Sequence, residues 1–156
     1  MKADQDSAQV TFPPPFVYLG FLLIGLAADR WLPWSLELGD DVRFSVAGAL
    51  AAVGLYLLIA AQGRFRRAET DLKPWKATTA IVDHGVYGFT RNPMYLGMAV
   101  LYLGLAIAFL SIGALILLPV VIFVIRTQVI AREERYLEGK FGDAYIGYKQ
   151  RVRRWL

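Results

Sequence analysis

The sequence predicts an all-α integral membrane bundle of about four transmembrane helices, and both composition and patterning favour this fold class. Of the 156 residues, 56% are hydrophobic and 19% are charged, whereas soluble domains average about a quarter charged residues. The ranges 44–61 and 94–125 contain no charged residue, and uncharged apolar runs of about 18 or more residues are typical of transmembrane helices. This composition excludes a soluble enzyme, a disordered chain and a nucleic-acid-binding module.

Residues 1–15 are expected to form a flexible N-terminus, because most of them are polar, of mixed charge or proline. The apolar run 16–28 is the first expected span, with Trp31 and Trp34 as interfacial aromatic residues. The second expected span, 44–61, is rich in alanine and glycine, which suits close packing of helices in a membrane.

The run 94–125 is too long for a single crossing. At 1.5 Å per residue it would reach about 48 Å, whereas the hydrocarbon core is about 30 Å thick. Residues 111–113 offer a turn near its middle. We therefore expect a helical hairpin with legs near 94–110 and 113–138, the second of which leaves the membrane as a charged helix.

Glycines and tyrosines repeat along the first leg of this hairpin. Gly97 and Gly104 lie seven residues apart, as do Tyr95 and Tyr102, so each pair falls on one helix face. For Gly104 and Tyr102 we expect a packing seam against another span rather than a catalytic role.

Basic residues predict the orientation, because cytoplasmic loops of membrane proteins carry an excess of lysine and arginine. The loop after the first span has only Arg30 and Arg43, and the tip of the hairpin has none. The other two segments carry Arg64, Arg66, Arg67, Lys73, Lys76 and Arg91, and then Arg126, Arg132, Arg135, Lys140, Lys149, Arg151, Arg153 and Arg154. An integral membrane protein with both N- and C-termini cytoplasmic is predicted.

Few catalytic groups are available. The chain has no cysteine and a single histidine, His84, so we expect no disulfide, no cysteine nucleophile and no metal site. Neither a GxGxxG nor a GxxxxGK[ST] pattern occurs. A nucleotide-like cofactor would have to be held without a Rossmann or P-loop domain.

Arg91, Asn92 and Pro93 predict a helix start. Asparagine is a good N-cap, and proline is tolerated at the first helical position. The free N–H groups of such a start form a site for a carboxylate or phosphate. The alternative is simply a well-capped transmembrane helix.

A second polar cluster follows the hairpin. Glu133 and Glu134 are adjacent, so their side chains lie about 100° apart on a helix, and one can face the protein while the other faces water. The alternative is a solvated helix with arginine–glutamate pairs. Phe141, Tyr145 and Tyr148 form an aromatic stripe that we expect to pack on the membrane surface.

Together, GVYGFTRNPMYLG, an apolar hairpin and EERYLEGKFGDAYIGYKQRV closely resemble the isoprenylcysteine carboxyl methyltransferase family, which belongs with the membrane phospholipid methyltransferases. The resemblance covers about residues 70–154. It divides the chain into the N-terminus, a pair of transmembrane helices at 16–62, and a methyltransferase core at 63–156.

The resemblance implies a membrane enzyme that uses S-adenosylmethionine as its cofactor. Carried over to this sequence, the family's cofactor contacts are Thr79, Ala80, Ile81, Val82, Tyr87, Asn92, Pro93, Met94, Tyr95, Glu133 and Glu134. In eukaryotic members an arginine that contacts substrate lies four residues before the first glutamate, where this chain has Val129. Arg126 or Arg132 could replace it, and Arg91, Arg126 and Glu133 are the candidate catalytic residues.

The residue chemistry suits this cofactor. The helix start at 92–94 could bind its carboxylate, a glutamate could bind its ammonium or ribose, and Tyr87 or Tyr95 could lie near its sulfonium. The expected acceptor is a lipophilic or lipidated carboxylate, thiol or amine, with carboxyl O-methylation favoured, and membrane lipids are the expected surroundings. The alternatives are a membrane reductase that binds NADPH in a similar C-terminal pocket and a non-enzymatic membrane scaffold.

Overall fold

The computed structural model describes residues 6–10, 12–67 and 76–156, and within these ranges it is helical with no strand. Lys73, counted above among the basic residues, lies outside the described residues. The elements are α1 (Pro14–Ala28), α2 (Asp40–Arg67), the short η1 (Gly85–Gly88), α3 (Pro93–Ala108), α4 (Ile112–Val124), the π-helical η2 (Ile125–Ile130), α5 (Ala131–Phe141) and α6 (Asp143–Arg151). The predicted all-α class is confirmed.

Two helical segments are long and apolar enough to cross a membrane. They are α2 and the continuous segment Ile112–Phe141, and only 17% and 28% of their apolar windows are buried. Most of that apolar surface therefore faces outward, as it does in a membrane protein and not in the core of a soluble one. α1 and α3 are shorter apolar helices, so the topology with four crossings stays a prediction.

The predicted hairpin is confirmed. α3 begins at Pro93 and ends at Ala108, and α4 begins at Ile112. The Ser111 hydroxyl accepts a hydrogen bond from the backbone N–H of Ala114 at 3.0 Å, which caps the second leg. That leg continues through η2 into α5. Its uncharged apolar run ends at Ile125, before Arg126, so α5 lies beyond the apolar stretch.

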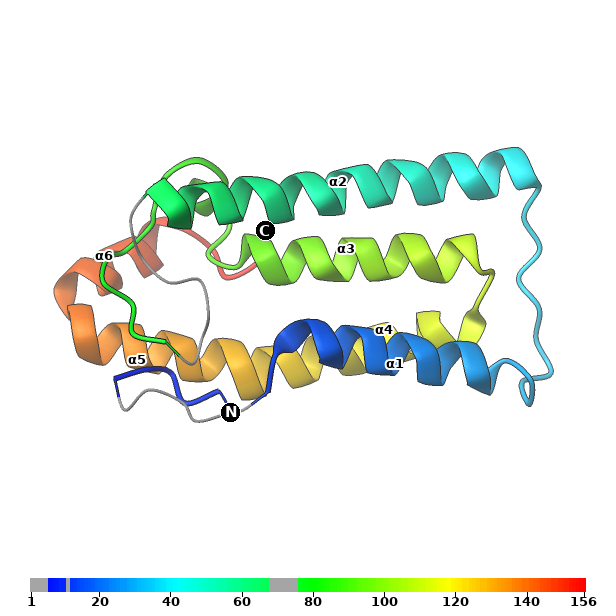
Figure 1. The fold of residues 1–156 in the computed structure, drawn as a ribbon, viewed down its shortest axis with the longest axis horizontal. Coiled ribbons are helices and arrows are strands. Elements are labelled where there is room, and N and C mark those ends of the chain that lie inside the picture. Colours follow the sequence, from blue (N-terminus) through cyan, green and yellow to red (C-terminus); the bar gives the residue numbers. More distant parts are fainter. Residues whose placement is uncertain (1–5, 11, 68–75) are drawn as a thin grey trace.

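Figure 1 shows α2 running beside α3, and α1 beside α4. The loop 29–39 and the hairpin turn 109–111 lie at one end of this bundle. The start of α3, the end of α2, α5 and α6 gather at the opposite end. Because α2 and α3 run antiparallel to each other, as do α1 and α4, the polar segments of the chain come together at one end.

Glycines allow α2 and α3 to approach closely. A Cβ atom added at Gly97 would lie 2.9 Å from the carbonyl oxygen of Gly54, and one added at Gly104 would lie 3.1 Å from that of Ala47. The Tyr102 hydroxyl donates to the Ala114 carbonyl at 3.0 Å. The predicted packing seam is confirmed, and small residues hold the two backbones in contact.

The end of the bundle away from the polar segments is held by two side chains. Asp29 accepts a hydrogen bond from the backbone N–H of Gly113 at 2.7 Å. The Arg43 guanidinium donates through Nε to the Ala108 carbonyl at 2.7 Å. Both bonds satisfy backbone groups at helix ends that have no partner within their own helix.

Substituting Gly97 by alanine is expected to destabilise the bundle. The new methyl group would meet the α2 backbone, which cannot move aside as a flexible side chain can, and overpacking of this kind costs about 1–3 kcal/mol. The measurement is thermal unfolding of the purified protein in detergent.

Gly48 provides the matched control, because nothing lies within 4 Å of a Cβ added there. Gly48→Ala is expected to be neutral or stabilising, since glycine costs a helix about 0.5–1 kcal/mol relative to alanine. Equal effects of the two substitutions would contradict the packing seam.

Candidate active site

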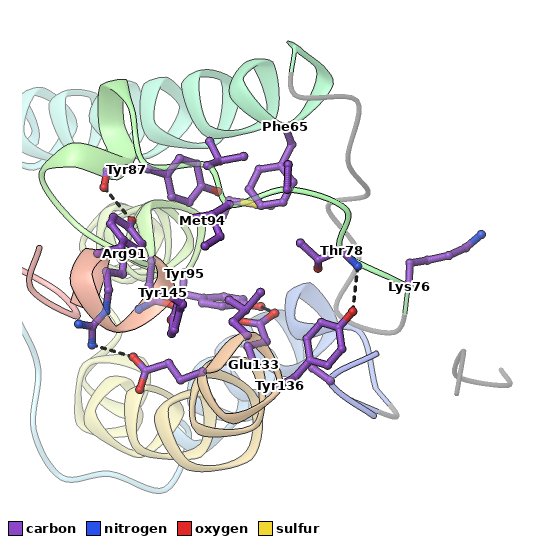
Figure 2. A pocket seen from close by; sticks show the side chains of 18 residues that line it. Phe65, Lys76, Thr78, Tyr87, Arg91, Met94, Tyr95, Glu133, Tyr136 and Tyr145 are labelled. Carbon is purple, nitrogen blue, oxygen red and sulfur yellow. Dashed lines mark hydrogen bonds and ion pairs between the residues drawn. The ribbon is translucent and has the colours of Figure 1, made fainter. Parts of the chain in front are cut away.

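A pocket with an empty volume of about 830 Å³, which includes some open solvent, lies at the polar end of the bundle. Its lining side chains come from segments far apart in the sequence (Figure 2). They are Ala8, Phe65, Lys76, Thr78, Ala80, Ile81, Val82, Tyr87, Arg91, Asn92, Met94, Tyr95, Glu133, Glu134, Tyr136, Leu137, Tyr145 and Tyr148.

The start of α3 forms one wall of the pocket. Asn92 is the N-cap residue, as predicted, but its side chain makes no cap hydrogen bond. Its Nδ2 instead donates to the Arg154 carbonyl at 2.9 Å. The side chain of Asn92 therefore holds the C-terminal residues, while Met94 and Tyr95 in the first turn of α3 line the pocket.

Arg91 directly precedes Asn92 in the sequence, and its side chain is only 8% exposed. Nη1 donates to the carbonyls of Lys149 at 2.9 Å and Val152 at 3.0 Å. Nη2 contacts Glu134 at 2.8 Å. Among the described residues Nε of Arg91 is buried without a hydrogen-bond partner, while the other two nitrogens of the guanidinium group are fixed by α5 and the C-terminal residues.

Glu134 forms a buried ion network. Besides its contact with Arg91, its Oε2 lies 2.5 Å from Nη2 of Arg154 and its Oε1 accepts from Nε of Arg154 at 3.0 Å. Burial alone would raise the pKa of Glu134, but the hydrogen bonds and charges of Arg154 and Arg91 outweigh it and hold the pKa below its ordinary value. Glu134 is thus ionised and already occupied by two arginines.

Glu133 has a different environment, although it is the adjacent residue. Its Oε1 accepts a hydrogen bond from the Tyr95 hydroxyl at 2.7 Å, and Figure 2 shows its carboxyl group turned toward the pocket. The pKa of Glu133 is raised to about 7. Burial is the main cause and the nearby charge of Glu134 adds to it, while the hydrogen bond from Tyr95 offsets part of the rise. Of the two glutamates, Glu133 is the one with capacity left for a ligand.

The π-helical segment η2 sets the direction of both glutamates. It spans Ile125–Ile130, directly before α5. A π turn holds more residues than an α turn, so the side chains after it are rotated relative to their positions on an unbroken α-helix. Such segments occur often at functional sites, and this one ends just before Glu133.

Tyrosines of α6 and η1 close another wall. Tyr145 and Tyr148 are 3% and 4% exposed, and the Tyr148 hydroxyl donates to the Tyr87 carbonyl at 2.8 Å. Phe141 packs against the same cluster. The prediction that this stripe lies on the membrane surface is wrong, because α6 turns back at Gly142 and buries its aromatic face against the pocket.

Most of the predicted site residues meet in this pocket. Arg91 and nine of the eleven predicted cofactor contacts line it: Ala80, Ile81, Val82, Tyr87, Asn92, Met94, Tyr95, Glu133 and Glu134. Thr79 is exposed and Pro93 is buried at the start of α3, and neither lines the pocket. Arg126 is exposed on η2 and also lies outside it. Contact of any of these residues with a ligand stays a prediction.

Several lining residues were not predicted. Tyr136 and Leu137 follow Glu133 by one helical turn, so helical periodicity could have identified them. Phe65 and Ala8 come from segments without a motif, and only the folded arrangement brings them to the pocket.

An apolar groove with an empty volume of about 740 Å³ lies next to the pocket, between α1, α2 and α3. We call it the lateral groove. Its lining residues are Pro15, Tyr18, Leu19, Leu22, Leu58, Met94, Met98, Leu101, Tyr102 and Leu105. Met94 lines both the groove and the pocket. The Tyr18 hydroxyl donates to the Tyr95 carbonyl at 3.0 Å, which joins the two sites further.

Comparison with known proteins identifies the family. The sequence pattern of the family described as phospholipid methyltransferase matches residues 42–144. The chain therefore belongs to the phospholipid methyltransferase family, and its class is that of the membrane methyltransferases.

Two relatives are similar over parts of the chain. An uncharacterized protein of Haemophilus influenzae is 48% identical over 63 residues, which are 40% of this chain and 100% of that protein. A protein-S-isoprenylcysteine O-methyltransferase of Schizosaccharomyces pombe is 32% identical over 72 residues, 46% of this chain and 30% of that protein. No solved structure matches the chain significantly.

Replacing Glu133 by glutamine is expected to remove the pH dependence of stability between about pH 5 and pH 7. The pKa of Glu133 is about 7 in the folded protein, so the folded state keeps a proton that the unfolded chain releases at lower pH. Stability of the native protein therefore falls as the pH rises through this window. Thermal unfolding at several pH values measures it.

Glu134→Gln is the contrasting variant. The pKa of Glu134 is lowered, so its contribution to stability is present above its ordinary pKa and is lost only at lower pH. We expect this variant to be less stable by about 3–5 kcal/mol, because two arginines lose their partner. Its slope between pH 5 and pH 7 should be reduced but still present, because Glu133 stays buried while it loses the neighbouring charge that raises its pKa further. An unchanged slope in Glu133→Gln would contradict the burial of that carboxyl group.

Proposed function

We propose that this protein is an integral membrane methyltransferase that transfers a methyl group from S-adenosylmethionine to a lipophilic acceptor, with a carboxylate as the methylated group. One observation carries the proposal: a pocket with charged and aromatic walls adjoins an apolar groove, and Met94 lines both. A water-soluble cofactor and a lipid-soluble acceptor would meet at that residue.

The polar part of the pocket suits the amino-acid portion of the cofactor. The first turn of α3 lines the pocket and has no side-chain cap. Its free N–H groups favour a carboxylate. Glu133 would accept hydrogen bonds from the ammonium group or the ribose.

The aromatic and apolar part suits the remaining portions. The rings of Tyr87 and Tyr95 favour a nearby sulfonium cation through their electron-rich faces. Ile81, Val82 and Leu137 offer apolar surface for the adenine ring. These assignments account for the side chains of the pocket without a Rossmann or P-loop domain.

When bound, S-adenosylmethionine would supply a methyl group on a positively charged sulfur. A carboxylate oxygen of the acceptor would bond to that methyl carbon as the carbon–sulfur bond breaks, giving a methyl ester and S-adenosylhomocysteine. The protein has little proton transfer to perform when the acceptor is an ionised carboxylate. Its residues contribute by positioning and by excluding water. Tyr95 and Met94 hold the boundary between the two sites, and Glu133 fixes the cofactor.

The lateral groove supports a lipophilic acceptor. Its lining is almost entirely apolar, and it lies among the helices that are proposed to cross the membrane. The similarity to a protein-S-isoprenylcysteine O-methyltransferase favours an acceptor with a hydrocarbon chain and a carboxylate. Arg126 is exposed and outside both sites, and a role for it in acceptor binding is tested by Arg126→Ala.

We also propose four crossings, with the pocket and both termini on the cytoplasmic side. The described N-terminal segment and the C-terminal residues lie at the same end of the bundle (Figure 1). Most basic side chains belong to the segments at that end, as the positive-inside rule requires.

The first test is binding of S-adenosylmethionine, S-adenosylhomocysteine and NADPH to the purified protein in detergent. We expect both S-adenosyl compounds to bind and NADPH not to. Glu133→Gln is expected to weaken S-adenosylmethionine binding about 10- to 150-fold, because hydrogen bonds to charged groups contribute about 1.5–3 kcal/mol.

Glu138→Gln is the control for this measurement, because Glu138 lies on the same helix, does not line the pocket and pairs with Lys149. Its cofactor affinity should equal that of the native protein. Selective binding of NADPH would replace the proposal with a reductase, and binding of none of the three compounds would favour a scaffold.

The second test concerns the acceptor. Leu105 lines the groove eleven residues along α3 from Met94, about 16 Å at 1.5 Å per residue. Leu105→Trp should therefore shorten the groove, and raise the KM for a farnesylated cysteine analogue at least tenfold and for a geranylated one less. Cofactor affinity should not change. Methyl transfer from a labelled cofactor measures both.

Ile59→Trp is the matched control, because Ile59 is 69% exposed on α2 and lies outside the groove. It should leave both KM values unchanged. A lipophilic thiol and phosphatidylethanolamine serve as competing acceptors, and methylation of either in place of the carboxylate would contradict the carboxyl assignment.

A further inference from the structure

The described N-terminal residues, 6–10, lie outside the range 42–144 that matches the family, yet they reach the cofactor pocket. Ala8 lines the pocket. Ala8 is 6% exposed and Val10 is 1% exposed, and both belong to the main hydrophobic core. These residues were expected from the sequence to belong to a flexible terminus, so their burial calls for an explanation.

Polar contacts attach this segment to α5, the helix that carries Glu133. The Asp6 carboxylate lies 2.5 Å from Nζ of Lys140, and the Tyr136 hydroxyl donates to the Asp6 carbonyl at 3.2 Å. Nη1 of Arg132 donates to the Gln9 carbonyl at 3.3 Å. Of these three side chains of α5, Tyr136 lines the pocket.

Tyr136 joins two separate segments at the pocket. Its hydroxyl accepts a hydrogen bond from the backbone N–H of Thr78 at 3.1 Å, in addition to its bond to Asp6. Thr78 and Tyr136 themselves line the pocket, and Figure 2 shows the bond between them. One hydroxyl therefore fastens both the N-terminal segment and the segment around Thr78 to α5.

The backbone of the N-terminal segment is held in an uncommon conformation. Gln9 has φ of 54°, in the left-handed region that residues other than glycine seldom adopt. It lies between Ala8, which faces the pocket, and Val10, which is fixed in the core. Strained residues of this kind persist only where surrounding contacts hold them, and they occur often at ligand sites.

We propose that residues 6–10 form a strap that closes the cofactor pocket and must leave Tyr136 and Lys140 before the cofactor is exchanged. This proposal rests on the proposed function, since it assigns the pocket to S-adenosylmethionine. Val10 is the fixed end of the strap, and Asp6 is the end that moves.

The two ends differ in the way this movement requires. Val10 is buried among apolar side chains, so pulling it out would expose apolar surface to water at a cost in free energy. The side chains of Lys140 and Asp6 are 27% and 61% exposed, and exposed ion pairs contribute little to stability. The strap therefore opens at Asp6 and stays attached at Val10.

A cross-link across the strap tests the proposal. The chain has no cysteine, so the double variant Asp6→Cys with Lys140→Cys can be joined by a short bismaleimide without background. We expect joining to lower both the association and dissociation rates of S-adenosylhomocysteine at least tenfold, and to change its Kd less than threefold. Cross-linked protein that exchanges this compound at the rate of the unjoined protein would overturn the proposal.

The matched control is a second pair on the same helix. Glu138 and Lys149 form an ion pair between α5 and α6, and neither lines the pocket or touches the strap. Joining Glu138→Cys with Lys149→Cys should leave the exchange rates unchanged. Equal slowing by both cross-links would mean that general stiffening of α5 causes the effect, and would also overturn the strap.

A variant without a cross-link tests the opposite direction. Lys140→Met removes the ion pair without changing a residue that lines the pocket, and should raise the dissociation rate of S-adenosylhomocysteine about threefold or more. Tyr136→Phe should raise it further. An unchanged dissociation rate in both variants would overturn the proposal.

Cross-link formation itself separates this proposal from the proposed function. The two introduced cysteines should join at least five times more slowly in the Tyr136→Phe background, whether or not the cofactor binds. If the native protein binds no S-adenosyl compound but this difference is found, the strap docks and the proposed function fails. If cofactor binds and the difference is absent, the strap fails alone.

Discussion

The site depends on one buried ion network, in which Glu134 contacts both Arg91 and Arg154. Arg91 stands at the start of α3, Glu134 on α5 and Arg154 beyond α6, so this network joins three segments that meet at the pocket. A buried charge without a partner is strongly destabilising. The three segments must therefore meet in one arrangement, and that arrangement leaves Glu133 and Tyr95 facing the pocket.

This network also explains why two adjacent glutamates serve different purposes. Both oxygens of Glu134 accept hydrogen bonds from arginines, and its pKa is lowered. Among the described residues Glu133 accepts a hydrogen bond from the Tyr95 hydroxyl alone, and its pKa is raised. The sequence alone shows two identical side chains next to each other. The two side chains differ because α5 is rotated after the π-helical segment. No sequence pattern in residues 125–130 predicts that segment.

The elements that sequence reasoning could predict are those governed by local chemistry. Apolar runs without charges predict the helices, the proline after Asn92 predicts the start of α3, and residues 111–113 predict the hairpin turn. The elements that it could not predict depend on contacts between distant segments. Tyr145 and Tyr148 looked like a membrane-facing stripe because their partners, such as the carbonyl of Tyr87, are some sixty residues away. Ala8 reaches the pocket for the same kind of reason.

The carbonyl groups that hold Arg91 and Asn92 belong to residues 149–154. During synthesis these residues leave the ribosome after all the apolar helices have been made. Insertion of the helices into the bilayer and assembly of the pocket are therefore separate events, and the second must wait for the first. A nascent chain halted before residue 149 would be a membrane-inserted bundle in which the guanidinium group of Arg91 has lost the carbonyl partners that fix it.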